Sequence, residues 1–161
     1  MHTQLVSYEV LTPIQREQLE QLKILSHQLP YSGDIDTALN TLLVRATPDI
    51  QGFVLLADDH AVGFFMLKRG AFLPHWATGD TATLHALQID HRMQGRGLGK
   101  ACLQALPQAV KAKWPDIKHV MLSVDAENQA AQNLYLSQGW VDTGEAYKGR
   151  IGFERRLSLT L

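Results

Sequence analysis

The sequence lacks the features that mark secreted or membrane-embedded proteins. Cys102 is the only cysteine among 161 residues, so no intrachain disulfide can form, which fits a reducing compartment. Residues 1–10 are polar and lack the apolar stretch of a secretory signal. No apolar run approaches the ~20 residues needed to cross a bilayer. We therefore expect a cytoplasmic protein with no membrane partner.

An excess of charge of one sign is also missing. Charged residues make up 19% of the chain, and its formal net charge is −1. This balance argues against an electrostatic grip on nucleic acid, although it leaves room for a basic patch around one anionic ligand. Neither a cysteine pair nor a tight His/Cys cluster is present, so no metal site is predicted.

Apolar residues are abundant, at 45% of the chain, which is enough for one well-filled core. No repeat, low-complexity block or linker divides the sequence, so we expect a single domain over residues 1–161. Hydrophobic periodicity predicts seven strands and four helices in the order β-α-α-β-β-β-α-β-α-β-β. The fold class is therefore α/β, with a central mixed sheet of about seven strands flanked by about four helices.

The expected element boundaries follow from this periodicity and from capping and breaker residues. The expected strands are residues 5–10, 53–57, 61–68, 81–89, 120–124, 141–147 and 151–159. The expected helices are a first one from Thr12 to the breakers Pro30 and Gly33, then residues 36–44, 98–113 and 128–138. Thr12, Pro13 and Gln15 form a capping box at the first helix, Asp36 caps the second, and Pro107 should kink or shorten the third.

Glycine is concentrated in one segment, which reads Gln94-Gly95-Arg96-Gly97-Leu98-Gly99-Lys100. The segment follows an expected strand and opens an expected helix. Glycines there allow a tight bend with exposed N–H groups, and the helix N-terminus adds partial positive charge. Arginine and lysine side chains in and beside the segment add formal positive charge. The segment therefore predicts a site for a diphosphate.

Two common phosphate-binding motifs fit this segment poorly. A P-loop would need glycine at position 94 and serine or threonine at 101, where the chain has Gln94 and Ala101. A dinucleotide fingerprint would need glycine or alanine at its sixth position, which here is Lys100 or Cys102. An ordinary helix-entry turn remains an alternative, but it does not need three glycines at alternate positions.

A third pattern, [QR]-x-x-G-x-[GA], is met by Gln94, Gly97 and Gly99. Further along, residues 128–140 meet the pattern N-x-x-A-x-x-L-Y-x-x-x-G-[FW], and residues 84–90 form a matching strand before the glycines. With these two motifs in this order, the chain resembles the GNAT superfamily of N-acetyltransferases over almost its whole length. The C-terminal half is also similar to bacterial spermine/spermidine acetyltransferases, through motifs that recur across the superfamily.

The resemblance implies acetyl-coenzyme A as co-substrate. The amides from Gln94 through Lys100 would receive its diphosphate, and Leu87, Gln88 and Ile89 would line the pantetheine as an added strand does. The N–H of Leu87 would donate to the thioester carbonyl, which gains negative charge in the transition state. The side chain of Asn128 would hydrogen-bond the pantetheine arm.

The resemblance also implies catalytic roles. Tyr135 matches the general acid that protonates the departing thiolate; a core tyrosine on an amphipathic helix is the alternative. Some family members carry an acidic base at the position of Ser123, and serine cannot serve as that base unaided. His85 is our first candidate for the base, because an ordinary histidine pKa lies near neutrality; a structural histidine or a water chain is the alternative. Asp125 and Glu127 are weaker candidates.

The acceptor is predicted only as a class. In families of this type it lies between the first helices and the last strands, which points to Tyr31, Asp34, His75, Trp76 and Tyr147. Acidic and aromatic groups together suit a small cationic amine. A protein N-terminal or lysine acetyltransferase and a non-catalytic acyl-coenzyme A-binding module are the alternatives. Since dimers are common in the superfamily, we expect a homodimer.

Overall fold

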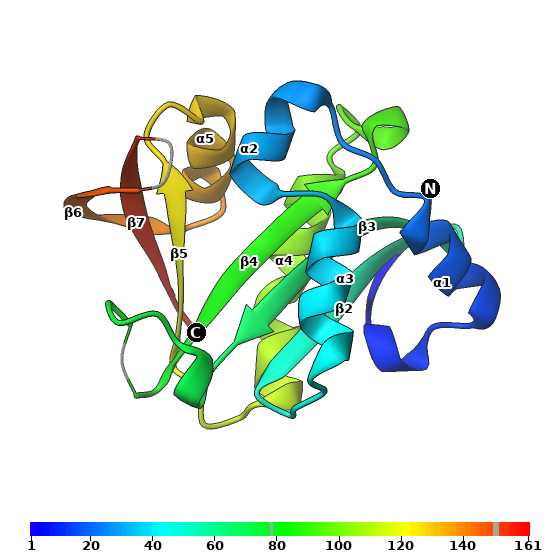
Figure 1. Ribbon diagram of the computed structural model, residues 1–161, viewed down its shortest axis with the longest axis horizontal. Helices are drawn as coiled ribbons and strands as arrows, with labels where there is room; N and C mark the ends of the chain where they lie inside the picture. Colours follow the sequence, from blue (N-terminus) through cyan, green and yellow to red (C-terminus); the bar gives the residue numbers. More distant parts are fainter. Residues whose placement is uncertain (78, 150–151) are drawn as a thin grey trace.

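A computed structural model describes the chain except Thr78, Arg150, Ile151 and the side chains of Glu145 and Ala146. Seven strands form one mixed sheet in the order β1-β2-β3-β4-β5-β7-β6 (Figure 1). The strands are β1 (Thr3–Ser7), β2 (Ile50–Ala57), β3 (His60–Lys68), β4 (Thr81–Ile89), β5 (His119–Asp125), β6 (Val141–Lys148) and β7 (Phe153–Thr160). The helices are α1 (Pro13–Glu20), the single-turn α2 (Leu29–Ser32), α3 (Ile35–Val44), α4 (Leu98–Lys113) and α5 (Gln129–Ser137). The predicted α/β class and mixed sheet are confirmed.

Helices cover both faces of the sheet (Figure 1). On one face, α4 and α5 bury side chains such as Cys102, Leu106 and Tyr135 against the strands. On the other face, α1 and α3 bury Leu19 and Leu39. Strands β2 and β3 are apolar on both faces because each face packs against one of these two cores. Among the described residues, none of the helices is both long and apolar enough to span a bilayer.

The start of the first helix is as predicted, but its end is not. The Thr12 hydroxyl accepts from the Gln15 N–H, and the Gln15 side chain accepts from the Thr12 N–H, which confirms the capping box. The helix ends at Glu20, well before Pro30. The backbone beyond it is diverted by tertiary hydrogen bonds, because the Lys23 carbonyl accepts from the His91 N–H at 2.7 Å. Pro30 lies inside the first turn of α2, where a missing N–H is tolerated.

The cap predicted for the second helix was wrong, and the third helix, whose predicted range of 98–113 is confirmed, is not shortened at Pro107. The cap of α3 is Asp34, whose carboxylate accepts from the Thr37 N–H at 2.8 Å, and Asp36 lies in the first turn instead. Helix α4 continues through Pro107 for its full 16 residues. Leu106 and Val110, both fully buried, anchor the turns around that proline, so packing offsets the missing backbone hydrogen bond.

The strand predictions differ mainly at their ends. The first strand is Thr3–Ser7, and Tyr8–Val10 form a 3-10 turn instead of extending it. Strands β2 and β5 begin earlier than expected, at Ile50 and His119. The last strand was predicted from Ile151, which lies outside the described residues, and β7 begins at Phe153.

Strand β4 is irregular in two ways that shape the sheet at its C-terminal end. It pairs with β5 in parallel only at Thr81–Thr83, so the two strands diverge beyond Thr83. Its register against β3 shifts between His85 and Gln88, where a bulge places Ala86 at a positive φ of 57°. A bulge leaves one residue out of the ladder and redirects its neighbours. The sheet therefore opens between β4 and β5, with irregular backbone on one side.

Candidate functional site

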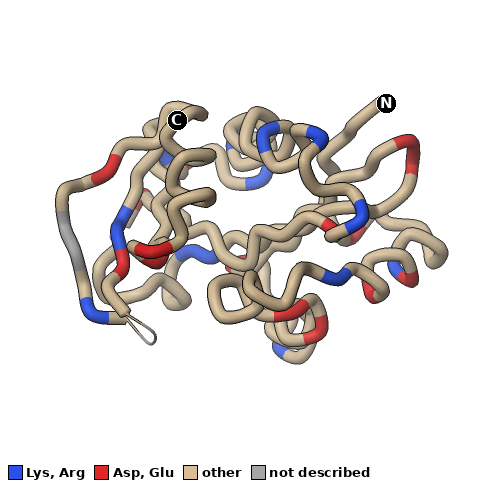
Figure 2. The backbone as a smooth tube through the Cα atoms, turned by 90° about the horizontal axis from the view of Figure 1, so that it is seen from above, with Lys and Arg blue, Asp and Glu red and all other residues tan. Residues whose placement is uncertain are grey.

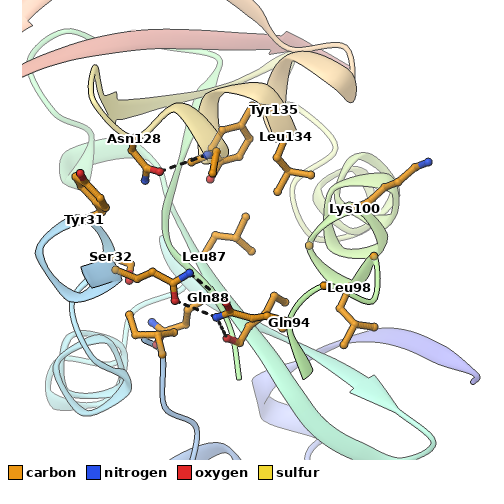
Figure 3. Close-up of a pocket in the computed structure, with 18 residues that line it drawn as sticks. Tyr31, Ser32, Leu87, Gln88, Gln94, Leu98, Lys100, Asn128, Leu134 and Tyr135 are labelled. Carbon is orange, nitrogen blue, oxygen red and sulfur yellow. Dashed lines mark hydrogen bonds between the residues drawn. The ribbon is translucent and has the colours of Figure 1, made fainter. Parts of the chain in front are cut away.

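Two adjoining cavities occupy the gap between the diverging strands. The larger one, about 430 Å³, lies between β4, α2, the start of α4 and α5 (Figure 3). The smaller one, about 240 Å³, extends between β4, β5 and β7. Six residues line both cavities: Tyr31, Ser32, Leu87, Asn128, Ala131 and Tyr135. The two cavities therefore form one continuous site with Tyr135 at their junction.

The glycine-rich turn forms one wall of the larger cavity. Gly95 and Gly97 both have a φ of 77°, in the left-handed region where side chains are strained. Gly97 is the N-cap of α4 and offers no side chain to the first N–H groups of that helix. A 16-residue helix presents partial positive charge at such an end. This wall presents backbone N–H groups of the kind that can hold an anionic group.

The turn is held in place by Gln94. Its Nε2 donates to the Ile89 carbonyl and to Gln28 Oε1, both at 2.9 Å. Gln28 Nε2 donates back to Gln94 Oε1 at 3.1 Å. This amide pair fastens the segment before α2 to the glycine-rich turn. Sequence reasoning missed Gln28, because no local pattern links residues that are 66 positions apart.

The end of β4 forms the floor of the larger cavity, which is lined there by Leu87, Gln88 and Ile89. Gln88 is buried, and its Nε2 donates to the Ala86 carbonyl at 3.1 Å. Its Oε1 is buried without a hydrogen-bond partner. A buried acceptor of this kind is costly unless a ligand donor satisfies it. An extended, amide-bearing ligand fits this floor.

The other predicted donor-site residues differ in how they face the cavity. Asn128 caps α5, with its Oδ1 accepting from the Ala131 N–H at 3.3 Å, and lines both cavities. Lys100 lines the larger cavity at its rim, where its side chain extends away from the other labelled residues (Figure 3). Arg96 is exposed and lines neither cavity. Leu134, which sequence reasoning did not assign to the site, also lines the larger cavity.

Tyr135 lies at the junction of the two cavities. Its ring is 8% exposed and meets Trp140 edge-on, with ring centroids 5.5 Å apart. Burial, with a smaller contribution from Cys102, raises the pKa of the Tyr135 hydroxyl far above its usual value. Since the phenol stays protonated at neutral pH, this residue can donate a proton but does not act as a resting base.

His85 lines the smaller cavity, but it lacks the near-neutral pKa for which it was chosen as the candidate base. Burial, and to a lesser extent the charge of Lys68, lower its pKa to about 4. Its Nε2 lies 2.6 Å from the Thr83 hydroxyl, which is fully buried. A histidine with this pKa is neutral at physiological pH but holds a captured proton weakly.

The low pKa of His85 predicts a pH-dependent stability that a His85→Gln variant would lack. An unfolded chain binds this proton below a pH of about 6.5, whereas the folded chain binds it only below about 4. Stability is therefore lost as pH falls through this window, by about 3 kcal/mol. Urea unfolding near neutral pH and near pH ~4.5 should show a larger loss for the wild type than for the variant. Equal losses would contradict a neutral buried His85.

The predicted acceptor residues are only partly brought together. Tyr31 lines both cavities, but Asp34 is committed to capping α3, and His75 is exposed in the loop before β4. Trp76 and Tyr147 line neither cavity.

Trp76 and Tyr147 instead flank a cation of the protein itself. The guanidinium carbon of Arg156 lies 4.6 Å from the Trp76 ring centroid and 3.0 Å from that of Tyr147. The expected aromatic contact with a cation is therefore present in the structure, but it is made within the chain.

Acidic and basic residues are scattered over the whole chain trace (Figure 2). Within the described residues, no group of three or more His, Cys, Asp or Glu side chains is arranged as a metal site. The site therefore relies on backbone N–H groups, amides, hydroxyls and a few carboxylates.

Solved structures with the same fold include acetyltransferases. An aminoglycoside acetyltransferase, AAC(6')-Ib, in complex with coenzyme A and kanamycin, is 15% identical with a TM-score of 0.75, covering 99% of this chain and 95% of that one. The ribosomal-protein-S18-alanine N-acetyltransferase from Escherichia coli is 18% identical with a TM-score of 0.66, covering 99% and 94%. At these identities the likeness shows the fold.

Sequence comparison extends the likeness. The uncharacterized N-acetyltransferase YbbJ of Bacillus subtilis is 31% identical over 101 residues, which are 62% of this chain and 63% of that protein. A mycothiol acetyltransferase of Renibacterium salmoninarum is 35% identical over 115 residues, 69% of this chain but only 32% of that protein. A sequence model of the acetyltransferase (GNAT) family matches residues 16–140. The chain therefore belongs to the GNAT family of acetyltransferases.

Proposed function

We propose that this protein transfers the acetyl group of acetyl-coenzyme A to the primary amine of a small cationic molecule, by direct attack of the amine. One observation carries the proposal: the glycine-rich turn, the open edge of β4 and the buried hydroxyl of Tyr135 share one continuous site. Family membership supports the choice of acyl donor.

The larger cavity suits the acyl donor. N–H groups of the turn from Gln94 to Lys100 receive the diphosphate, and the floor at Leu87–Ile89 receives the extended pantetheine. Gln88 Oε1, which is buried without a partner, accepts from an amide N–H of the ligand. Asn128 contacts the pantetheine arm from the opposite wall. Bound acetyl-coenzyme A supplies an activated acyl carbon and a thiolate leaving group.

Two groups at the cavity junction act on the transferring acetyl group. The Leu87 N–H lies in the β4 bulge, outside the register with β3, and donates to the acyl oxygen as it gains charge. The Tyr135 hydroxyl, protonated at neutral pH because it is buried, donates to the leaving sulfur.

The smaller cavity suits the acceptor. Two carboxylates, those of Asp125 and Glu154, line it together with the aromatic ring of Tyr31. Negative charge beside an aromatic ring favours a cationic amine. The cavity's volume of about 240 Å³ admits a small molecule or the tip of a larger one.

Coenzyme A binding and acetyl transfer are tested separately. Titration calorimetry should detect binding of coenzyme A, and a thiol-release assay should detect turnover with acetyl-coenzyme A and at least one amine. The amines are spermidine, kanamycin and a peptide with an N-terminal alanine, and the control omits the amine. Turnover with only the peptide would contradict the small-amine assignment. Binding without turnover would favour a non-catalytic acyl-coenzyme A module, and no binding would overturn the proposal.

A further inference from the structure

The carboxylate of Glu154 is built into the wall of the smaller cavity. Glu154 lies on β7, opposite Asp125 of β5 on one side and Tyr147 of β6 on the other. The Ser123 hydroxyl on β5 donates to Glu154 Oε2 at 2.7 Å, and both side chains line the cavity. Strand β5 thus contributes a serine hydroxyl that holds a carboxylate supplied by β7, its neighbour in the sheet.

The β6–β7 hairpin leaves room for this carboxylate. Gly149 follows β6, and a Cβ on that residue would lie 2.5 Å from both Cδ and Oε1 of Glu154. Any side chain at position 149 would therefore push the carboxyl group of Glu154 aside. The glycine and Ser123 constrain the same group from two directions.

Proton transfer from an ammonium to the cavity wall requires a suitable acceptor. The ionisable groups lining the cavity are Tyr31, His85, Asp125, Tyr135 and Glu154. Tyr135 stays protonated, and the pKa of His85 lies near 4 with its Nε2 beside the Thr83 hydroxyl. Asp125 Oδ1 accepts from the Glu127 N–H in the turn before α5.

The Glu154 carboxylate is held in place by Ser123 and can still accept further hydrogen bonds or a proton. A carboxylate has about four lone-pair sites, and the Ser123 hydroxyl occupies one of them. Among the described residues, the other charged groups near this region are Arg156, two residues along β7, and Lys68, whose charge acts on His85. Arg156 is directed over the rings of Trp76 and Tyr147.

We propose that Glu154 is the proton acceptor for the substrate ammonium, held in position by Ser123. This inference rests on the proposed acetyl transfer. The Glu154 carboxylate takes one proton from the ammonium, and the freed nitrogen pair forms the bond to the acyl carbon. The carbon–sulfur bond breaks with its electron pair going to sulfur, which takes the Tyr135 proton. The second proton lost by nitrogen restores the Tyr135 phenol, and Glu154 releases the first proton to solvent.

The test compares Glu154→Gln with the wild type, using whichever amine of the panel is turned over fastest. The glutamine keeps the size of the side chain and can still accept from Ser123, but it cannot take a proton. We expect kcat/KM for the amine to fall about 100-fold at neutral pH, with the coenzyme A Kd unchanged. The loss should shrink to less than about tenfold at alkaline pH, because more of the amine is then already neutral.

Three variants separate this role from a structural one. Glu20→Gln makes the same change at an exposed position of α1 that lines neither cavity, and it should match the wild type. Ser123→Ala and Gly149→Ala should each lower kcat/KM less than Glu154→Gln does, because they displace the carboxylate without removing it. A neutral-pH rate for Glu154→Gln within about twofold of wild type, or a loss that does not change with pH, overturns the inference. Failure of the wild type with every amine overturns the proposed function as well.

Discussion

Replacing Tyr135 with phenylalanine is expected to lower kcat about 100-fold or more, with little change in the Kd of coenzyme A. The hydroxyl lies at the junction of the two cavities, and burial keeps it protonated. Without it, the leaving sulfur must depart as a thiolate. Stopped-time thiol-release assays and calorimetry on the same preparation measure both quantities.

The phenylalanine ring should preserve the packing of α5. The edge-on contact with Trp140 involves the ring alone, so the midpoint of thermal unfolding should change little. Tyr8→Phe is the matched control, because Tyr8 is buried to a similar degree in the core on the other face of the sheet. It should leave kcat unchanged. Unaltered turnover in Tyr135→Phe would remove this hydroxyl from the mechanism.

Replacing Gly97 with alanine should weaken coenzyme A binding about tenfold. Gly97 has a φ of 77°, and a side chain there adds about 1–2 kcal/mol of strain. No atom lies within 4 Å of the added Cβ, so the effect comes from the backbone alone. The turn can relieve this strain only by changing φ, which turns its N–H groups away from the diphosphate. Calorimetric titration with coenzyme A measures the shift.

Gly139→Ala is the control for strain in general. Gly139 has a φ of 89° after α5, and its added Cβ would meet only Leu159 Cδ1, at 3.9 Å. Both variants should lose a similar amount of unfolding free energy, but only Gly97→Ala should lose coenzyme A affinity. Equal affinity in the two variants would mean that the turn does not hold the diphosphate.

The glycine-rich turn and the start of α5 were predictable because their signals are local. The φ values at Gly95 and Gly97 and the cap at Asn128 depend mainly on neighbours in the sequence. Steric limits on φ and helix capping act over a few residues, so residue order alone reveals them. The β2–β3 hairpin and the capping box at Thr12 were predictable for the same reason.

The residues that meet at the smaller cavity were decided by the tertiary structure. Sequence gave no sign that β7 would insert between β5 and β6, which places Glu154 beside Ser123, 31 positions away. Nor did it show that Arg156 would lie over Trp76 and Tyr147, or that His85 would be buried enough to lower its pKa to about 4.

The physical reason for this division is the range of the forces involved. Backbone sterics and capping hydrogen bonds act between near neighbours, so the sequence by itself determined the glycine-rich turn and most of the elements around it. Desolvation, ion pairing and strand order depend on which distant segments share a face of the sheet. Only the packed structure could therefore decide which carboxylate, serine and tyrosine meet at the smaller cavity.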